Sequence, residues 1–356
     1  MPQSYNNLYS KVYDFQNLLI AFYRARAGKR KRKDVAQFEF NLEKYLIKLS
    51  QELKYRTYRP GKCNNFYIKD QKRRLITAAP FRDRIVHHAL LQVIEPIFER
   101  MFIFDSYGCR VNKGQHRACD RYQQFARNSR YVLKCDIQKF YPSVDHKILL
   151  GIVNRWIKDK DIMGLIKIIL ESGKDVLKKE YIPTWFPGDN LFTPFERAKG
   201  LPIGNLTSQF FGNIYLNELD HFIKENLRIR CYLRYMDDFA LFDDSKKILW
   251  TYKKKIIDFL SKLRFILNPK KQSVIPVNIG VDFLGYRIYP SHRLARKSTV
   301  YRYIRRLKCL ISEVNEGKIP KDQLNASLKD WYGHIKHAHS YNFKQMVIRR
   351  MKIIEC

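Results

Sequence analysis

The sequence predicts an α+β protein in which helices at both ends of the chain flank a group of short strands. Apolar residues recur at helical spacing in 8–23 and again in 38–53. Short β-prone runs bounded by turn residues follow, and they alternate with longer helical stretches. The chain has 356 residues, of which 45% are apolar, so it is long enough for two or three subdomains with a real core.

The expected elements follow in chain order. Helices are expected over 1–55, 81–104, 145–170, 210–223, 246–264, 295–315 and 320–350. Strands are expected over 65–68, 75–76, 131–136, 233–242 and 281–288, and the first two of these pair as a hairpin. Pro96 predicts a bend in its helix. Residues 171–199 are rich in Pro and Gly and are expected to form an irregular insertion.

The charge of the chain indicates what kind of partner it binds. Lys and Arg number 68 against 34 Asp and Glu, which gives a net charge of +34. An excess of this size favours a polyanionic partner. The chain also has 23 Tyr and 23 Phe among its basic residues, which favours nucleic acid over a membrane surface.

Three further features exclude other classes of protein. The seven cysteines show no Cys-x-x-Cys spacing, which argues against a zinc site and against a disulfide framework. His334, His337 and His339 have no Cys or carboxylate at ligand spacing, so packing or phosphate contact explains them better than a metal. The chain has no signal-peptide pattern and no run of 18 apolar residues, which predicts a cytoplasmic, reduced protein without a membrane partner.

The tetrapeptide Tyr235-Met236-Asp237-Asp238 is the sharpest motif in the chain. Apolar, β-prone residues flank it on both sides, which predicts a tight hairpin with two adjacent carboxylates at its turn. Adjacent strand residues face opposite ways, so two neighbouring Asp converge only where the backbone turns. Carboxylate oxygens suit Mg²⁺. An ordinary acidic turn is the simpler alternative for an isolated Asp-Asp pair.

Asp136 is the third candidate carboxylate. It ends the predicted strand 131–136, where a strand-end acid could close a site around two ions. Two metal ions about 3.5–4 Å apart can clamp the attacking and leaving oxygens of an in-line phosphoryl displacement. Taken alone, Asp136 could equally be an ordinary acid at the end of a strand.

In this order, the motifs resemble those of the reverse transcriptases. The matching segments are the basic hairpin with Arg74, the helix Arg82-Asp83-Arg84-Ile85-Val86-His87-His88-Ala89-Leu90, the Asp136 strand, the loop 200–209, the Tyr235–Asp238 hairpin and Phe283-Leu284-Gly285-Tyr286. The resemblance covers roughly residues 55–345. It implies a right-hand polymerase of fingers, palm and thumb, with an antiparallel palm sheet and a helical, basic thumb. The implied boundaries are an N-terminal helical extension at 1–57, fingers at 58–130, palm at 131–290 with the variable insertion 171–199, and thumb at 291–356.

The loop 203–209 resembles one group within that family. Most reverse transcriptases carry Gln where this chain has Ile203, and Pro where it has Gln209. Here Ile203-Gly204-Asn205-Leu206-Thr207-Ser208-Gln209 resembles the Ile/Val/Leu-Gly-x-x-x-Ser-Gln signature of diversity-generating retroelement reverse transcriptases. That resemblance implies an enzyme that copies a template repeat RNA into cDNA with errors at adenines. It also implies a small, basic accessory variability determinant protein as partner.

The resemblance also assigns roles to individual positions. Asp136, Asp237 and Asp238 would be catalytic and would hold two Mg²⁺ ions, or Mn²⁺, with the Ile137 carbonyl as an extra ligand. The substrates would be deoxynucleoside triphosphates, template RNA and the cDNA/RNA duplex. The nucleotide-binding positions would be Lys69, Lys72 and Arg74 on the triphosphate, Tyr141 as the steric gate under the sugar, Ile203, Gly204 and Gln209 along the nascent base pair, and Lys270 or Lys271 near the pyrophosphate.

Two alternatives remain open from the sequence. The first is a reverse transcriptase of the retron or group II intron type, against which Gln209 argues. The second is a non-catalytic RNA-binding protein on the same fold, against which the presence of all three acids argues.

Overall fold

The computed structural model describes residues 4–69, 73–174 and 176–340. As predicted, the N-terminal part is helical, with α1 (Tyr9–Tyr13), α2 (Phe15–Arg26), α3 (Lys33–Phe40) and α4 (Leu42–Lys54). The Asp14 carboxylate accepts a hydrogen bond from the Asn17 amide at 3.1 Å and so caps α2. One face of α2 is buried at helical spacing, and it packs against α5 (Phe81–Glu99).

Helix α5 follows a two-stranded antiparallel sheet of β1 (Asn64–Lys69) and β2 (Arg73–Ala78). This hairpin confirms the predicted strand pair. The prediction that the helix continues to residue 104 is wrong, because α5 ends at Glu99. The Arg110 guanidinium donates hydrogen bonds to the carbonyls of Ile103 (2.7 Å) and Ser106 (2.9 Å), which stabilises a turn there instead of further helix.

The centre of the molecule is a four-stranded antiparallel sheet in the order β4-β5-β3-β6. Its strands are β3 (Tyr131–Asp136), β4 (Tyr232–Tyr235), β5 (Asp238–Asp243) and β6 (Ser273–Pro276). Strands β4 and β5 form the predicted hairpin, whereas β6 was not predicted. Strand β3 runs beside β5 from Tyr131 opposite Asp243 to Asp136 opposite Asp238. The register therefore fixes Asp136 and Asp238 side by side.

Helices cover both faces of this sheet. The larger ones are α6 (Gln115–Arg127), α8 (His146–Trp156), α9 (Lys160–Glu171), α11 (Leu206–His221) and α12 (Lys246–Lys262). Helices α8, α9 and α12 begin after side chains that cap them: Asp145, Asp159 and Ser245. The remaining short helical pieces are α7 (Phe140–Ser143), α10 (Thr193–Glu196), η1 (Lys178–Glu180), η2 (Phe222–Asn226, a π-helix), η3 (Pro269–Lys271) and η4 (Val277–Ile279).

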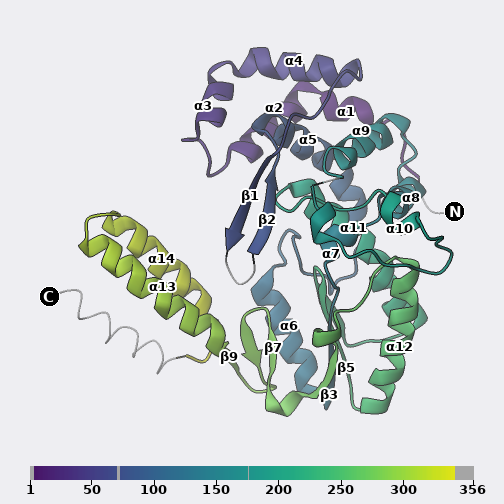
Figure 1. Cartoon of the computed structure of the whole chain (residues 1–356), viewed down its shortest axis with the longest axis vertical. Helices are drawn as coiled ribbons and strands as arrows, with labels where there is room; N and C mark the ends of the chain where they lie inside the picture. Colours follow the sequence, from purple (N-terminus) through teal and green to yellow (C-terminus); the bar gives the residue numbers. More distant parts are fainter. Residues whose placement is uncertain (1–3, 70–72, 175, 341–356) are drawn as a thin grey trace.

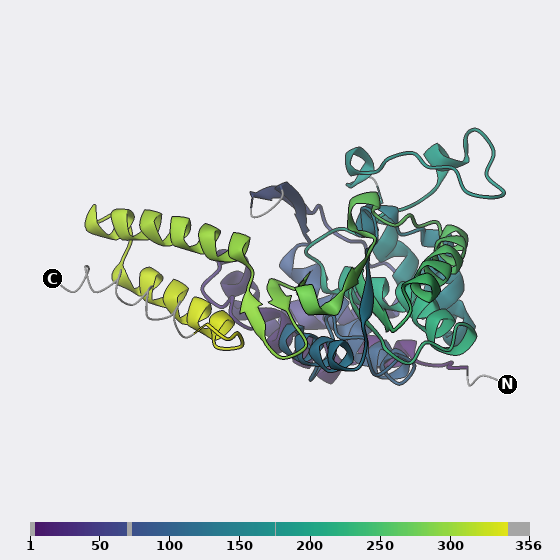
Figure 2. The same cartoon turned by 90° about the horizontal axis from the view of Figure 1, so that it is seen from below.

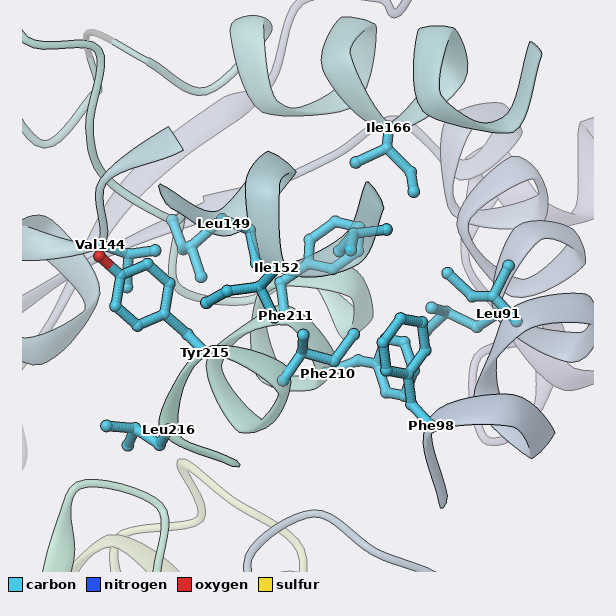
Figure 3. Close-up of a cluster of buried hydrophobic side chains, with 14 of the residues drawn as sticks. Leu91, Phe98, Val144, Leu149, Ile152, Ile166, Phe210, Phe211, Tyr215 and Leu216 are labelled. Atoms are coloured by element: carbon cyan, nitrogen blue, oxygen red, sulfur yellow. The ribbon is translucent and has the colours of Figure 1, made fainter. Parts of the chain in front are cut away.

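Alternating strand residues pack into two separate hydrophobic cores. Leu133 and Phe239 lie in the larger core, with α5, α8, α11 and α12. Val132 and Phe242 lie in a smaller core against α6 and the last strands. Successive strand side chains face opposite sides of a sheet, so the two cores hold it from both faces. Figure 3 shows part of the larger core, in which Phe210, Phe211 and Tyr215 of α11 meet side chains of α5 and α8.

The last third of the described chain contains a three-stranded sheet and two helices. The strands are β7 (Val281–Phe283), β8 (Tyr286–Ile288) and β9 (Arg293–Ala295). The prediction of a single strand over 281–288 is wrong. Leu284 (φ 44°) and Gly285 (φ 86°) both adopt left-handed backbone conformations, which turn the chain into a hairpin.

The two final helices are α13 (Lys297–Asn315) and α14 (Lys321–Ile335). The rings of Tyr303 and Trp331 stack between them with their centroids 4.0 Å apart. Helix α14 ends at Ile335, earlier than the predicted residue 350, and residues 341–350 lie outside the described part. Figures 1 and 2 show this helix pair projecting from the rest of the molecule, and it contacts the three-stranded sheet at its base.

The predicted insertion is irregular, as expected, but buried ion pairs anchor it. The Arg197 guanidinium contacts Asp189 at 2.5 Å and Asp145 at 3.4 Å, and all three side chains are almost completely buried. The six cysteines in the described part are free thiols. None of the described helices combines the length and the apolar character that crossing a bilayer requires.

We expect Phe211→Ala to lower the free energy of unfolding by about 3–5 kcal/mol, because the fully buried ring of Phe211 leaves a cavity in the larger core. Urea denaturation followed by circular dichroism measures this change. Phe40→Ala is the matched control, since Phe40 is 89% exposed and loses little contact. Equal losses in the two variants would contradict this account of the core.

Candidate active site

The β4–β5 hairpin brings two of the three candidate acids to one end of the central sheet. Tyr235 pairs with Asp238, so Met236 and Asp237 form a two-residue turn. Met236 has φ 54°, a left-handed conformation that costs a residue with a side chain about 1–2 kcal/mol. Asp136 ends β3 directly opposite Asp238. The structure therefore places Asp136, Asp237 and Asp238 together, as the sequence predicted.

Protein donors occupy both carboxylate oxygens of Asp136. The Lys271 ammonium lies 2.5 Å from Oδ2, and the Asn268 side-chain amide donates to Oδ1 at 3.1 Å. The Asn268 backbone amide also donates to the Asp136 carbonyl, at 2.8 Å. The Ile137 amide donates to the Asp237 carbonyl at 3.2 Å, which ties the end of β3 to the turn.

Two of the acids, Asp237 and Asp238, are largely shielded from water, and this raises their pKa values. Burial first, and then the charges of Asp238 and Asp136, raise the pKa of Asp237 to about 7. Burial also raises the pKa of Asp238, although the nearby Lys134 and Lys271 oppose the shift. Both carboxyl groups therefore hold protons more tightly than exposed acids do, and a bound cation would favour their ionised forms.

The donor chemistry at this end of the sheet fits a hard divalent cation. Three carboxylates supply only oxygen ligands, which Mg²⁺ prefers. The Asp238 Oδ1 atom is buried and has no hydrogen-bond partner, so it is available as a ligand. Nevertheless, the described residues contain no group of three or more His, Cys, Asp or Glu side chains that is already arranged to hold a metal ion. At Asp136, a bound cation would have to replace Lys271 or Asn268.

Tyr141 lies beside the acids, five residues after Asp136. Its ring contacts Phe140 with centroids 5.1 Å apart, and its backbone carbonyl accepts a hydrogen bond from the Leu201 amide at 2.8 Å. Burial first, and then nearby charges that include Asp237, raise the pKa of the Tyr141 hydroxyl. The predicted steric-gate residue is therefore near enough to Asp237 for the charge of that carboxylate to affect it.

The loop that begins α11 rests on strand β2. The Thr77 amide donates to the Ile203 carbonyl at 2.8 Å. Gly204 has φ 118°, and a Cβ atom there would lie 2.9 Å from a methyl carbon of Ile76, so only glycine fits. Ile203 and Gln209 are both half-buried. This contact brings the predicted base-pair positions to the foot of the β1–β2 hairpin.

A basic pocket of about 730 Å³ opens at this contact. Its lining includes Gly204 and Gln209 together with the cationic side chains of Arg24, Lys29, Arg32, Lys62 and Arg84. Asp34 is the acid in this lining. Burial, followed by the charges of Arg24 and Lys29, lowers the pKa of His88 in the pocket to about 4. The pocket therefore has the electrostatic character of a phosphate-binding surface.

Two of the three predicted triphosphate contacts lie on the hairpin. Arg74 is exposed on β2, and Lys69 belongs to β1. Lys72 lies outside the described residues. Lys271 is in the site but is paired with Asp136 rather than free. Lys270 is exposed beside it.

The roles of two polar residues near the site, Asn268 and Arg234, were not predicted from the sequence. Asn268 bonds to Asp136 across a separation of 132 residues, which no local pattern shows. Arg234, next to the predicted turn, is fully buried and forms an ion pair with Asp220 at 2.6 Å. A charged residue inside an apolar strand was the available signal, because such residues are almost never buried unless they are paired.

Comparisons with known proteins agree with this geometry. The family model described as "Reverse transcriptase (RNA-dependent DNA polymerase)" matches residues 67–288. The group II intron-encoded protein LtrA of Lactococcus lactis is 29% identical over 184 residues, which are 51% of this chain and 28% of LtrA. Protein YkfC of Escherichia coli is 28% identical over 300 residues, 72% of this chain and 73% of YkfC.

Solved structures also match in part. The apo telomerase of Candida tropicalis has a TM-score of 0.44 and 15% identity, covering 70% of this chain and 53% of that chain. The family model spans more than half of the chain, from the β1–β2 hairpin through β8. On that match the chain belongs to the reverse transcriptase family, which has the fold of the right-hand polymerases.

Proposed function

We propose that this protein is an RNA-directed DNA polymerase. The observation that carries the proposal is the convergence of Asp136, Asp237 and Asp238 at one end of the central sheet, with Asp136 and Asp238 in register. Reverse transcriptase domains use divalent metal ions. Two Mg²⁺ ions held by these carboxylates and the Ile137 carbonyl would activate the primer 3′-hydroxyl and stabilise the leaving pyrophosphate. The reaction then needs no protein nucleophile.

We further propose a place for each substrate around the acids. We assign 58–130 to fingers, 131–290 to palm and 291–356 to thumb, with 1–57 as an extension that helps to form the basic pocket. Arg74, Lys69 and Lys72 would hold the triphosphate from the hairpin, since Arg offers forked donors that suit phosphate oxygens. The pocket beside Gly204 and Gln209 would take the phosphates of the template RNA.

Within that activity, we propose error-prone cDNA synthesis in a diversity-generating retroelement. Ile203 and Gln209 support it, because Ile203 lies in the loop that docks on β2 and Gln209, in the first turn of α11, lines the adjacent pocket. An apolar Ile203 cannot make the hydrogen bond that Gln makes at that position in most relatives. The nascent pair would be held more loosely as a result. A small basic accessory variability determinant protein is part of this proposal.

A second candidate is supported by the named relatives. LtrA is a group II intron-encoded protein, and a putative COX1/OXI3 intron 2 protein of Saccharomyces cerevisiae is 25% identical over 221 residues. This chain covers only 28% and 24% of the lengths of those two proteins. A group II intron or retron type of reverse transcriptase would share the polymerase chemistry and differ in RNA substrate and fidelity.

We expect Asp237→Asn to lower the rate of primer extension on an RNA template by several orders of magnitude, because it removes a proposed metal ligand. RNA binding should stay near the wild-type level. Asp258→Asn, on the exposed face of α12, is the matched control and should retain full activity. Extension by the Asp237 variant at the wild-type rate would contradict the metal assignment.

We expect Tyr141→Ala to admit ribonucleotides, since removing the ring leaves room for a 2′-hydroxyl beside Asp237. The measurement is incorporation of rNTP relative to dNTP at equal concentration. An unchanged ratio would show that Tyr141 serves only packing with Phe140.

We expect Ile203→Gln to reduce misincorporation opposite template adenine by about fivefold, because it restores one well-placed hydrogen bond of about 1 kcal/mol. Sequencing of cDNA made from a defined RNA gives the error spectrum. Ile203→Leu is the control, because it keeps an apolar side chain and should keep the errors. Errors spread evenly over the four template bases would favour the second candidate and leave the polymerase proposal standing.

A further inference from the structure

Arg234 carries a buried charge two residues before Met236, the first residue of the Met236-Asp237 turn. Its side chain and that of Asp220 are completely buried. The Arg234 Nη2 and Nε atoms contact the two Asp220 oxygens at 2.6 and 2.8 Å. A buried ion pair of this kind is costly unless further hydrogen bonds satisfy its remaining polar atoms. The hydrogen bonds made by the remaining guanidinium donors therefore indicate what this ion pair stabilises.

The remaining donors of Arg234 reach the turn and the segments around it. Its Nη1 atom donates to the Met236 carbonyl at 3.2 Å and to the Asn213 side-chain oxygen at 3.0 Å. Its Nη2 atom also donates to Ser106 Oγ at 3.1 Å. One planar group thus joins α11, the loop before α6 and the hairpin turn.

The turn needs this support because its conformation is unfavourable. Met236 has φ 54° and is 7% exposed. Its side chain lies against Gly108, where a Cβ atom would come within 2.6 Å of the Met236 Cγ atom. The Asn213 amide in turn donates to the Gly108 carbonyl at 2.8 Å. The same network therefore holds the turn from both sides.

We propose that Arg234 is a positioning residue that fixes the Met236-Asp237 turn, so that the Asp237 carboxylate stays directed toward Asp136. This inference rests on the proposed polymerase function. Lysine could neutralise Asp220 but has a compact ammonium in place of a planar fork. It could not contact Asp220, Asn213 and the Met236 carbonyl in the same geometry, so charge and positioning can be separated experimentally.

The first experiment compares Arg234→Lys with Arg197→Lys. Arg197 is also a buried arginine paired with aspartate, but it anchors the insertion and does not contact the turn. Single-turnover primer extension should slow by about 10- to 100-fold in Arg234→Lys, as for groups that orient metal ligands. The Mg²⁺ concentration for half-maximal rate should rise, while affinity for the primer–template stays unchanged. Arg197→Lys should alter none of these quantities.

A metal-free measurement tests the same idea without catalysis. Hydrogen exchange in the peptide that spans β4 and β5 should accelerate in Arg234→Lys and not in Arg197→Lys. Exchange in α6 and α12 should be the same in both variants. Equal acceleration throughout the protein would show a general loss of stability and would overturn the positioning role.

A second pair of variants covers the case in which Arg234→Lys fails to fold. Arg234→Gln combined with Asp220→Asn removes both charges and leaves no unpaired ion in the core. We expect this double variant to fold and to lose rate as Arg234→Lys does. Met236→Gly should recover part of that rate, because glycine adopts a positive φ at little cost. Absence of coupling between Met236→Gly and the double variant would overturn the proposal.

The outcomes also separate this inference from the proposed function. A wild-type protein that does not extend a primer would contradict the polymerase proposal, and the exchange measurement would still decide the role of Arg234. A wild-type protein that extends, together with Arg234→Lys at the same rate and the same Mg²⁺ requirement, would overturn this inference alone.

Discussion

The mutual repulsion of three carboxylates at one end of the central sheet is the constraint on which the site depends. The register of β3 and β5 brings Asp136 and Asp238 together, and the β4–β5 turn adds Asp237. Burial raises the pKa values of Asp237 and Asp238, and the charges of the neighbouring acids add to both shifts. The sheet must therefore be held rigidly, since a looser one would let the acids move apart. The two hydrophobic cores on opposite faces of the sheet provide that rigidity.

The same rigidity reaches the proposed nucleotide-binding positions through a few specific contacts. The hairpin β1–β2 is joined to the loop before α11 by the bond from the Thr77 amide to the Ile203 carbonyl. Gly204 permits the close approach of the two backbones. Helix α11 then runs through the larger core, where Phe211 is fully buried. We therefore expect changes in this loop to act at the proposed nucleotide-binding positions.

Sequence reasoning located the acids because each follows from local geometry: Asp136 ends an apolar strand, and Asp237 and Asp238 lie at a hairpin turn. The family resemblance assigned the successive segments to fingers, palm and thumb. Helix α6 received no assignment, because its buried positions are mostly small residues in a strongly polar segment. The turn at Leu284 was missed because a leucine with positive φ has no sequence signature. Asn268 was missed because its partner Asp136 lies 132 residues away in the sequence. Arg234 was missed because its partner Asp220 lies outside the motif.

The net charge of +34 does not by itself explain how the protein tolerates its acidic site. At physiological ionic strength, exposed charges are screened over about 8 Å, so the basic surfaces on the N-terminal helices and on α13 contribute little at the acids. Two neighbouring lysines do contribute: Lys271 contacts Asp136 directly, and Lys134 opposes the raised pKa of Asp238. The surface charge is thus free to serve binding of a polyanion. The local lysines offset only part of the repulsion, and the unpartnered Asp238 oxygen is where a further cation would complete the balance.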